Sequence, residues 1–404
     1  MKKNIEKIQK NHCYGCQACS NVCPRNCIKM IEDKNGFLMP KVDNSKCVNC
    51  GLCINICPSK IVSVKRNDNE TLVYAANVKD YNIRQESTSG GVFFPLAEYV
   101  IKQGGYVYGA AFDEDYNVVH ICAENMDEVR RCMKSKYVQS NMNGVYKQIA
   151  EQSQTKLVMF TGTPCQIAAL SNYPNVNRER LILVDLVCHG VPSPKLWKKY
   201  LSEKEKEYGK INKIKTRDKK EYGCSQSETI IQFANGEEYR RVLDKDEYMR
   251  AFMRGYSLRS SCYNCQFKGK SRKSDLTIGD FMSAAKYVKE TDNFCGTSMI
   301  IANSNKGSQI IRQISNQLEV HRIYSKKPLI VDWTWGLSIP YKKQSEYFYD
   351  VCFAQDKSLE RSLKKTELYL KKKEKLGQNK GTYEVILEIK RKIKELYYQY
   401  IFKL

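Results

Sequence analysis

Cysteine is the residue type whose spacing points most clearly to chemistry in this sequence. Eighteen of the 404 residues are cysteine, and nine of them lie before residue 60. The pattern Cys-x-x-Cys-x-x-Cys-x-x-x-Cys-Pro occurs at 13–24 and again at 47–58. Three closely spaced thiolates can bind three corners of a 4Fe–4S cubane, and the fourth corner needs a more distant ligand. The spacing therefore predicts two such clusters, whereas zinc ribbons, which use two separated CxxC pairs, fit it poorly.

The two runs resemble those of two-cluster ferredoxins, in which the fourth cysteine of each run binds the other cluster. We therefore expect a ferredoxin-like domain over residues 1–65. One 4Fe–4S cluster is expected on Cys13, Cys16, Cys19 and Cys57. The other is expected on Cys47, Cys50, Cys53 and Cys23. Cys27 is interpreted as a buried core thiol in preference to a ninth ligand.

Four later cysteines lie where strands or turns are expected to end. Cys165 follows an apolar run at 156–160 and the pair Thr163-Pro164, which suits the N-cap and first position of a helix. The helix dipole would favour a thiolate there. Cys188 ends a second apolar run at 181–187. With the CxxC pair Cys262 and Cys265, these residues predict a third 4Fe–4S cluster, against which a disulfide redox pair or a zinc site competes.

Two polar segments could hold a ligand. The run 87–91 (Ser-Thr-Ser-Gly-Gly) precedes apolar positions at 92–100 with helical spacing, so we expect its Ser and Thr to cap that helix. Free amides at a helix start favour a phosphate, although an ordinary glycine loop is the alternative. The donors of 134–140 could bind an anionic or polar ligand, unless they form a solvated loop. We expect a strand at 105–111 and a linker or edge strand at 66–80.

Composition narrows the class of protein. Lys and Arg number 67 against 44 Asp and Glu, a net charge of +23, and 42% of residues are hydrophobic. No apolar segment follows Lys2 and Lys3, and no run approaches about 18 apolar residues. We therefore expect a cytoplasmic protein with reduced thiols, not a secreted disulfide scaffold. The five remaining cysteines are interpreted as packing thiols: Cys122, Cys132, Cys224, Cys295 and Cys352.

The C-terminal part, 350–404, is expected to be a basic helical tail. From residue 357 onward it holds 14 Lys and Arg against 6 Asp and Glu. One helical face is expected at Ile386, Ile389, Ile393, Leu396, Tyr397 and Tyr400. A helix packed on its own domain is favoured over a membrane-surface or partner helix. No nucleic-acid-binding motif accompanies the charge, so nucleic acid is not an expected partner.

Six ordered landmarks resemble one known family, the coenzyme F420 (deazaflavin) hydrogenase/dehydrogenase beta subunits, which include 7-hydroxymethyl chlorophyll a reductase. They are 87–91, 135–140, 162–166, 188–190, the 262–265 CxxC pair and 278–280. The resemblance covers about 75–340. It implies an α+β fold, with a mixed-sheet core in two parts (75–175 and 176–345) between the ferredoxin-like domain and the tail.

The resemblance also implies FAD as a cofactor. The residues expected to contact FAD are Ser87, Thr88, Ser89, Gly90, Gly91, Ser135, Lys136, Tyr137, Gln139, Ser140, Thr161, Gly162 and Thr163. His189 is a candidate proton donor to flavin or substrate, though it could equally hydrogen-bond a cluster sulfur or pack in the core. The third cluster would lie nearest the flavin.

The electron counts predict the order of cofactors. Clusters pass single electrons and hydride acceptors take two, so FAD belongs between them. We expect an FAD-dependent iron–sulfur oxidoreductase that exchanges electrons with a ferredoxin or other redox protein and with a small molecule. The alternatives are a coenzyme F420 oxidoreductase and an electron-transfer subunit of a larger complex. The basic surface suits an acidic ferredoxin, and an oligomer is compatible with the sequence.

Overall fold

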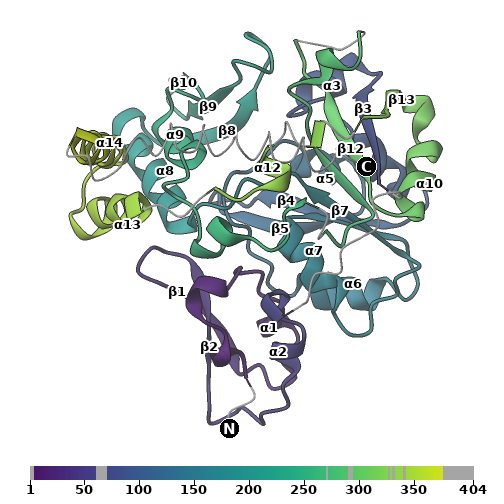
Figure 1. Ribbon diagram of the computed structural model, residues 1–404, viewed down its shortest axis with the longest axis horizontal. Coiled ribbons are helices and arrows are strands. Elements are labelled where there is room, and N and C mark those ends of the chain that lie inside the picture. Colours follow the sequence, from purple (N-terminus) through teal and green to yellow (C-terminus); the bar gives the residue numbers. More distant parts are fainter. Residues whose placement is uncertain are drawn as a thin grey trace, which may run out of the picture. The chain divides into compact units, whose positions relative to one another are not determined.

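The computed structural model describes residues 4–60, 71–269, 272–289, 294–325, 328–329, 333–339 and 343–375 (Figure 1). The chain forms two compact units, Met1–Tyr341 and Lys342–Leu404. Within the described residues, no helix has the length and apolar character needed to cross a membrane.

The N-terminal domain pairs a hairpin with two short helices. The hairpin strands β1 (Ile28–Glu32) and β2 (Leu38–Val42) are antiparallel. Helices α1 (Ala18–Asn21) and α2 (Leu52–Asn55) each carry the third cysteine of one run. Four cysteines belong to the buried core of this domain, beside only a few aliphatic side chains. With so few aliphatic side chains in this core, metal–thiolate bonds at the cysteines would add to the stability of the domain.

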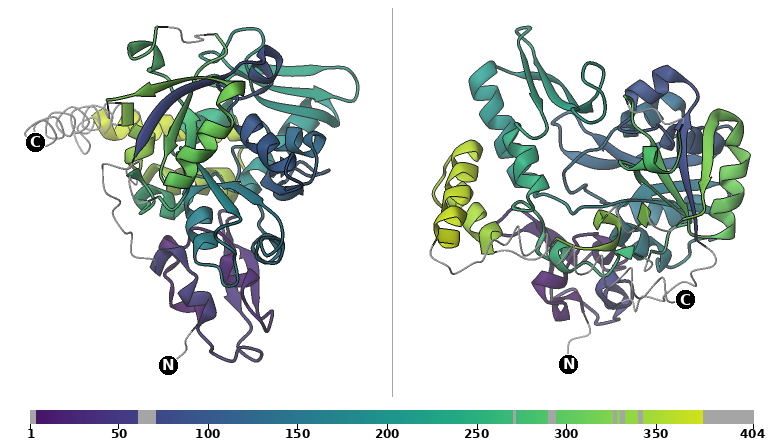
Figure 2. Two further views of the ribbon diagram at one scale, coloured as in Figure 1. Left: turned by 90° about the vertical axis from the view of Figure 1, so that its right-hand side faces the viewer. Right: turned by 45° about the horizontal axis from the view of Figure 1, so that its top comes forward.

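An eight-stranded mixed sheet forms the centre of the larger unit (Figures 1 and 2). In spatial order its strands are β13 (Leu318–Ile323), β3 (Leu72–Val78), β12 (Ser298–Ala302), β11 (Leu276–Asp280), β7 (Leu181–Leu186), β6 (Val158–Gly162), β4 (Tyr106–Phe112) and β5 (Val118–Ala123). The four strands β11, β7, β6 and β4 are mutually parallel. Each of the other four strands pairs antiparallel with its neighbours. The carboxyl ends of the four parallel strands therefore meet at one edge.

Helices cover both faces of this sheet. Helices α4 (Phe93–Ile101), α5 (Met126–Cys132) and α10 (Asn305–Gln313) share one buried apolar cluster with the sheet. Helices α6 (Val145–Gln152) and α7 (Pro164–Ser171) share the other. Cys16, Ala18 and Ile56 of the N-terminal domain belong to this second cluster, so that domain packs directly against the α6–α7 side.

The remaining elements flank the sheet. A three-stranded antiparallel sheet has the order β10 (Glu238–Val242), β9 (Glu228–Phe233), β8 (Ile211–Asp218). Among the described residues, the larger unit also contains α3 (Tyr81–Glu86), α8 (Pro194–Tyr208), α9 (Glu247–Met253), the 3₁₀ turn η5 (Ser260–Asn264) and α12 (Trp333–Gly336). The second unit holds α13 (Lys343–Tyr349), the π-helical Asp350–Ala354 and α14 (Leu359–Lys375). The face expected between Ile386 and Tyr400 lies outside the described residues.

Most expected elements are found, and two expectations are wrong. The strands at 105–111, 156–160 and 181–187 correspond to β4, β6 and β7. The expected linker or edge strand is instead the internal strand β3, paired on both sides. Helix α4 follows the Ser-rich turn as expected, but its N-cap is Val92. Ser87 Oγ donates instead to the Ile83 carbonyl (2.7 Å), and Ser89 Oγ donates to the Thr297 carbonyl (2.9 Å), so both hydroxyls fix the turn itself.

A buried ion pair fastens the segment after the CxxC turn to the sheet. Arg272 Nη1 lies 3.1 Å from Asp185 Oδ1 at the end of β7, and their side chains are 1% and 0% exposed. The same Arg272 nitrogen donates to the Leu186 carbonyl at 2.9 Å. Loss of one partner would leave the other charge buried and uncompensated.

We expect Arg272→Met to lower the free energy of unfolding by about 3–5 kcal/mol, because the Asp185 carboxyl would be left buried without its ion-pair partner. The double variant Arg272→Met/Asp185→Leu should recover part of this loss. Anaerobic urea unfolding followed by circular dichroism would measure both. Equal destabilisation in the single and double variants would show that the loss comes from other contacts of Arg272, such as the Leu186 carbonyl, and not from the unpaired Asp185 carboxyl.

Candidate functional site

A cavity of about 700 Å³ lies at the carboxyl ends of the parallel strands. Its wall is formed by the segments that directly follow β6, β7 and β11, together with the turn before α4 and the 132–140 segment. Crevices at this edge of parallel strands are the usual place for ligands in α/β folds. The volume lies within the range of small-molecule and cofactor sites.

The predicted cofactor residues converge on this cavity from three separate segments. The wall includes Ser87, Thr88, Ser89, Gly91, Ser135, Lys136, Tyr137, Gln139, Ser140, Thr161, Gly162 and Thr163. Gly90 has a different role, because a Cβ atom there would lie 2.4 Å from the Ala76 carbonyl oxygen of β3. Two of the segments are joined directly, since the Ser135 amide donates to Thr88 Oγ1 at 3.0 Å.

Two helices begin at the cavity. Thr163 is the N-cap of α7, with Pro164 at its first position as expected, and the Thr163 amide donates to Gln166 Oε1 at 2.8 Å. Val92 and Phe93, at the start of α4, also form part of the wall. Helix N-termini carry partial positive charge and unpaired amides, so this wall favours an anionic group such as a phosphate.

The charged side chains in the wall also favour an anionic ligand. Among the described lining residues there are four cations, Lys134, Lys136, Arg217 and Lys286, against the carboxylate Asp280. Burial lowers the pKa of Lys136 to about 8, while its Nζ donates to the Arg131 and Met133 carbonyls. This composition fits an anionic cofactor.

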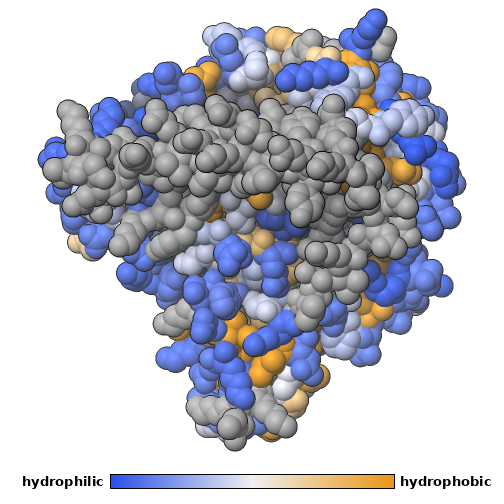
Figure 3. Space-filling model, in the orientation of Figure 1, coloured by the Kyte–Doolittle hydropathy of each residue, from blue (hydrophilic) through white to orange (hydrophobic). Residues whose placement is uncertain are grey.

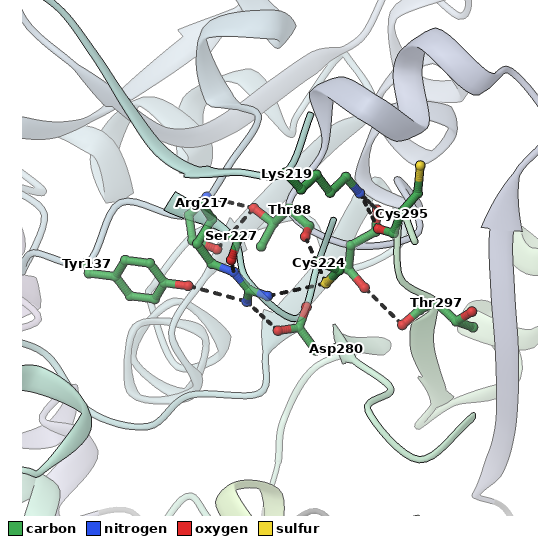
Figure 4. Close-up of polar contacts among 11 residues, drawn as sticks. Thr88, Tyr137, Arg217, Lys219, Cys224, Ser227, Asp280, Cys295 and Thr297 are labelled. Atoms are coloured by element: carbon green, nitrogen blue, oxygen red, sulfur yellow. Dashed lines mark hydrogen bonds and ion pairs between the residues drawn. The ribbon is translucent and has the colours of Figure 1, made fainter. Parts of the chain in front are cut away.

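Arg217 is the most tightly held of these cations (Figure 4). Its Nη1 pairs with Asp280, its Nη2 lies 3.5 Å from Cys224 Sγ, and the Tyr137 hydroxyl lies 3.4 Å from Nη1. Arg217 adopts a left-handed backbone conformation (φ 51°), which carries the side chain from the end of β8 into the wall. Sequence analysis missed this residue, because no local motif marks it.

Two histidines line the cavity, and both are neutral at physiological pH. Burial, followed by Lys268, lowers the pKa of His189 to about 4, and its Nε2 donates to the Phe252 carbonyl at 3.2 Å. Burial also lowers the pKa of His120 to about 4, while its Nε2 donates to the Thr161 carbonyl at 2.9 Å. Within the part of the chain that the structure describes, His120 Nδ1 is buried without a hydrogen-bond partner. That atom offers an acceptor to a bound group, and sequence analysis did not single it out.

The four later cysteines lie together next to the cavity. Cys165 begins α7, Cys188 follows β7, Cys262 lies in η5 and Cys265 follows it. Cys165 interacts electrostatically with Cys265 and Cys188, and Cys262 interacts electrostatically with Cys188 and Cys265. Burial raises the pKa of Cys262 to about 12 and also raises the pKa of Cys165 well above its usual value, so thiolates here need a positive partner. Cluster iron would supply it.

Cationic side chains surround this group. Lys268 and Arg272 both act against the effect of burial on the pKa of Cys188. Lys268 Nζ also donates to the Cys188 carbonyl. A 4Fe–4S cluster with four thiolate ligands is anionic, and the charges of these side chains therefore fit it. Across the described residues, no three His, Cys, Asp or Glu side chains are drawn together in the way a single metal ion requires.

Electrostatic interactions link most of the N-terminal cysteines into two groups. Cys16 interacts electrostatically with Cys57, Cys19 and Cys13, whereas Cys53 does so with Cys50 and Cys23. Cys53 also influences Cys19, and Cys16 influences Cys165. The three groups of thiols therefore follow one another, with the group of Cys16 in the middle and that of Cys165 at the cavity. Cys27 is buried as expected, but its Sγ lies 3.3 Å from Cys23 Sγ.

Arg259 joins the first cysteine run to the core. Its side chain is 2% exposed, and its Nε donates to the Cys13 carbonyl at 2.6 Å. Nη2 lies 3.4 Å from Cys13 Sγ, and Nη1 donates to Gln139 Oε1 at 2.9 Å. Gln139 Nε2 in turn donates to the Tyr14 and Gly15 carbonyls. Arg259 was not predicted, although its position three residues before Cys262 is a signal that could have drawn attention to it.

Comparisons with known proteins find one match for the N-terminal domain and one for the part of the core that contains the four later cysteines. Residues 155–326 match the family model for the C terminus of the coenzyme F420 hydrogenase/dehydrogenase beta subunit. Residues 12–61 match the model of the 4Fe-4S dicluster domain. No curated protein matches the chain. A chain of the solved F420-reducing NiFe hydrogenase complex from Methanosarcina barkeri is similar, with 17% identity, 75% of this chain and 92% of that chain covered, and a TM-score of 0.45.

The two family matches confirm the resemblance and the ferredoxin-type domain that the sequence predicted. Cysteine runs, charge and buried thiols account for the binding of 4Fe–4S clusters by the N-terminal domain. The chain is thus an iron–sulfur redox protein in which a 4Fe–4S dicluster domain precedes a region that matches the family model for the C terminus of the coenzyme F420 hydrogenase/dehydrogenase beta subunit.

Proposed function

We propose that the chain is an iron–sulfur flavoprotein oxidoreductase that passes electrons between three 4Fe–4S clusters and a two-electron acceptor, with FAD as the cofactor in the cavity. The observation that carries the proposal is the composition of the cavity wall. It combines Cys165 and Cys188, two expected ligands of the third cluster, with the loops expected to contact FAD. When bound, FAD supplies the change between one-electron and two-electron chemistry.

The order of the thiol groups supports a single path for electrons. The group of Cys53 is the outermost, since its member Cys50 is exposed, as are the neighbouring Val48 (60%) and Leu52 (39%). Figure 3 shows hydrophobic patches over this N-terminal domain, among mostly hydrophilic neighbours. Electrons from a redox protein would enter there, pass through the group of Cys16 and reach the group of Cys165 beside the cavity.

Residues of the chain would hold and shield the cofactor. The N-termini of α4 and α7 and the cationic side chains would bind its phosphates. Phe252 and Ile278 give the wall an apolar portion that excludes water. His189 stays the predicted residue for proton handling, and as a neutral ring it holds its proton at Nε2, toward the Phe252 carbonyl.

A second candidate function is a coenzyme F420 oxidoreductase. It is favoured by one observation, the match of 155–326 to a family of coenzyme F420 hydrogenases and dehydrogenases. The same cavity would then also receive the deazaflavin.

Cofactor content tests the first candidate directly. We expect anaerobically purified protein to contain about twelve iron atoms, a similar amount of acid-labile sulfide and about one FAD per chain, because three 4Fe–4S clusters need four iron atoms each. Colorimetric iron and sulfide assays and the fluorescence of released flavin would measure this. Protein that holds zinc and no flavin would contradict the proposal.

Lys286 offers a test of the cavity as the flavin site. It is exposed and lines the cavity, whereas the equally exposed Lys289 is not part of the wall. We expect Lys286→Glu to weaken FAD binding roughly fivefold, about 1 kcal/mol, through repulsion of the phosphates. The matched control Lys289→Glu should bind FAD like the wild-type protein. Titration of the deflavinated protein gives both dissociation constants, and equal weakening would place FAD elsewhere.

Reduced coenzyme F420 distinguishes the two candidates. If the chain is a coenzyme F420 oxidoreductase, anaerobic addition of the reduced coenzyme should bleach the absorbance of the bound flavin. If the two-electron partner is another molecule, reduced ferredoxin should bleach the flavin and reduced coenzyme F420 should leave it oxidised. Stopped-flow absorbance spectroscopy separates these outcomes.

A further inference from the structure

The second cysteine group contains one thiol more than a 4Fe–4S cluster needs. A small cavity of about 20 Å³ in the N-terminal domain has five cysteines in its wall: Cys23, Cys27, Cys47, Cys50 and Cys53. Four of these are the expected ligands of the second cluster. Cys27 is the fifth, and its Sγ lies 3.3 Å from Cys23 Sγ and within hydrogen-bonding reach of Cys47.

A tight turn brings Cys27 to this position. The Asn26 amide donates to the Cys23 carbonyl at 3.1 Å, and Asn26 adopts a left-handed conformation (φ 46°), which asparagine tolerates well. The turn reverses the chain between the two cysteines. The Cys27 carbonyl then accepts from the Asp43 amide at 2.7 Å, next to the β1–β2 hairpin. Both thiols are thereby held against the same cavity.

The internal repeat shows that this extra thiol is confined to one site. Cys47 follows Cys13 by 34 positions, as Cys57 follows Cys23, and the same step leads from Cys27 to Ile61. Cys57, the expected fourth ligand of the first cluster, is therefore followed by an aliphatic residue where Cys23 is followed by a thiol. The repeat supplies a natural control for any role of Cys27.

We propose that Cys27 is an alternate fourth ligand of the second 4Fe–4S cluster, interchangeable with Cys23. In the exchange, the bond from iron to Cys23 Sγ breaks and a bond from iron to Cys27 Sγ forms. The Cys27 thiol releases its proton and the Cys23 thiolate takes one up, so the cluster keeps its charge and no electron moves. The inference rests on the second cluster of the proposed function.

The test compares single and double variants of the full chain, purified without oxygen. Cys23→Ala should keep the iron and sulfide content of the wild-type protein, because Cys27 takes the vacant position. Cys27→Ala should also keep it. Cys23→Ala/Cys27→Ala should lose about four iron atoms, the content of one 4Fe–4S cluster. The repeat control Cys57→Ala should lose about four iron atoms as a single variant, since no thiol stands at position 61.

The outcomes separate this inference from the function on which it rests. If Cys23→Ala loses the same iron as the double variant, Cys27 is not a ligand and the inference is overturned. If the wild-type protein itself lacks the iron of a second cluster, the proposed function fails first. Circular dichroism shows whether each variant is folded.

A second measurement leaves Cys23 in place. An iron chelator competes for the cluster each time a ligand bond opens, and a replacement thiol shortens that interval. We expect the second cluster of Cys27→Ala to lose iron to a ferrous chelator faster than the wild-type cluster does, followed by absorbance. Equal rates would overturn the proposal even if Cys23→Ala does not accumulate as folded protein.

Discussion

The buried guanidinium of Arg259 is the interaction on which the rest of the site depends. One side chain contacts the backbone and sulfur of Cys13, the Leu38 carbonyl of the hairpin and the side chain of Gln139. It thus fixes the N-terminal domain against the core at the point where the first cysteine group approaches the third. If Cys13 binds a cluster as proposed, this hydrogen bond to its sulfur would also raise the reduction potential of that cluster.

Electrostatics explains why so many cations are buried near the cysteines. Thiolates and anionic clusters are costly to bury unless positive charge is close. Arg259 beside Cys13, and Lys268 and Arg272 beside Cys188, supply that charge within the protein. The net charge of +23 is therefore only partly a surface property. Some of it belongs to the interior of the redox centre.

Features that depend on neighbouring residues could be predicted from the sequence. Contacts between residues far apart in the chain could not. The cysteine runs and the Thr163-Pro164 helix start depend on neighbouring residues, and the family resemblance drew the 87–91, 135–140 and 161–163 segments to one cofactor. Arg259, Arg217 and His120 act through partners far away in the chain, such as Cys13 and Asp280, and no local pattern marks them. Strand β3 was misjudged because the charged segment before it concealed a buried strand with partners more than 200 residues later.

The domain that carries the repeated cysteine runs is symmetric in sequence and asymmetric in its surroundings. The group with Cys16 packs against helices of the core, while the group with Cys50 faces solvent. The two halves of the repeat are therefore not equivalent. The group with Cys50 is open to an external redox partner, and the group with Cys16 is packed against the core of the same chain. Reversing the domain would move the group with Cys16 away from the core, even though every cysteine would still be present.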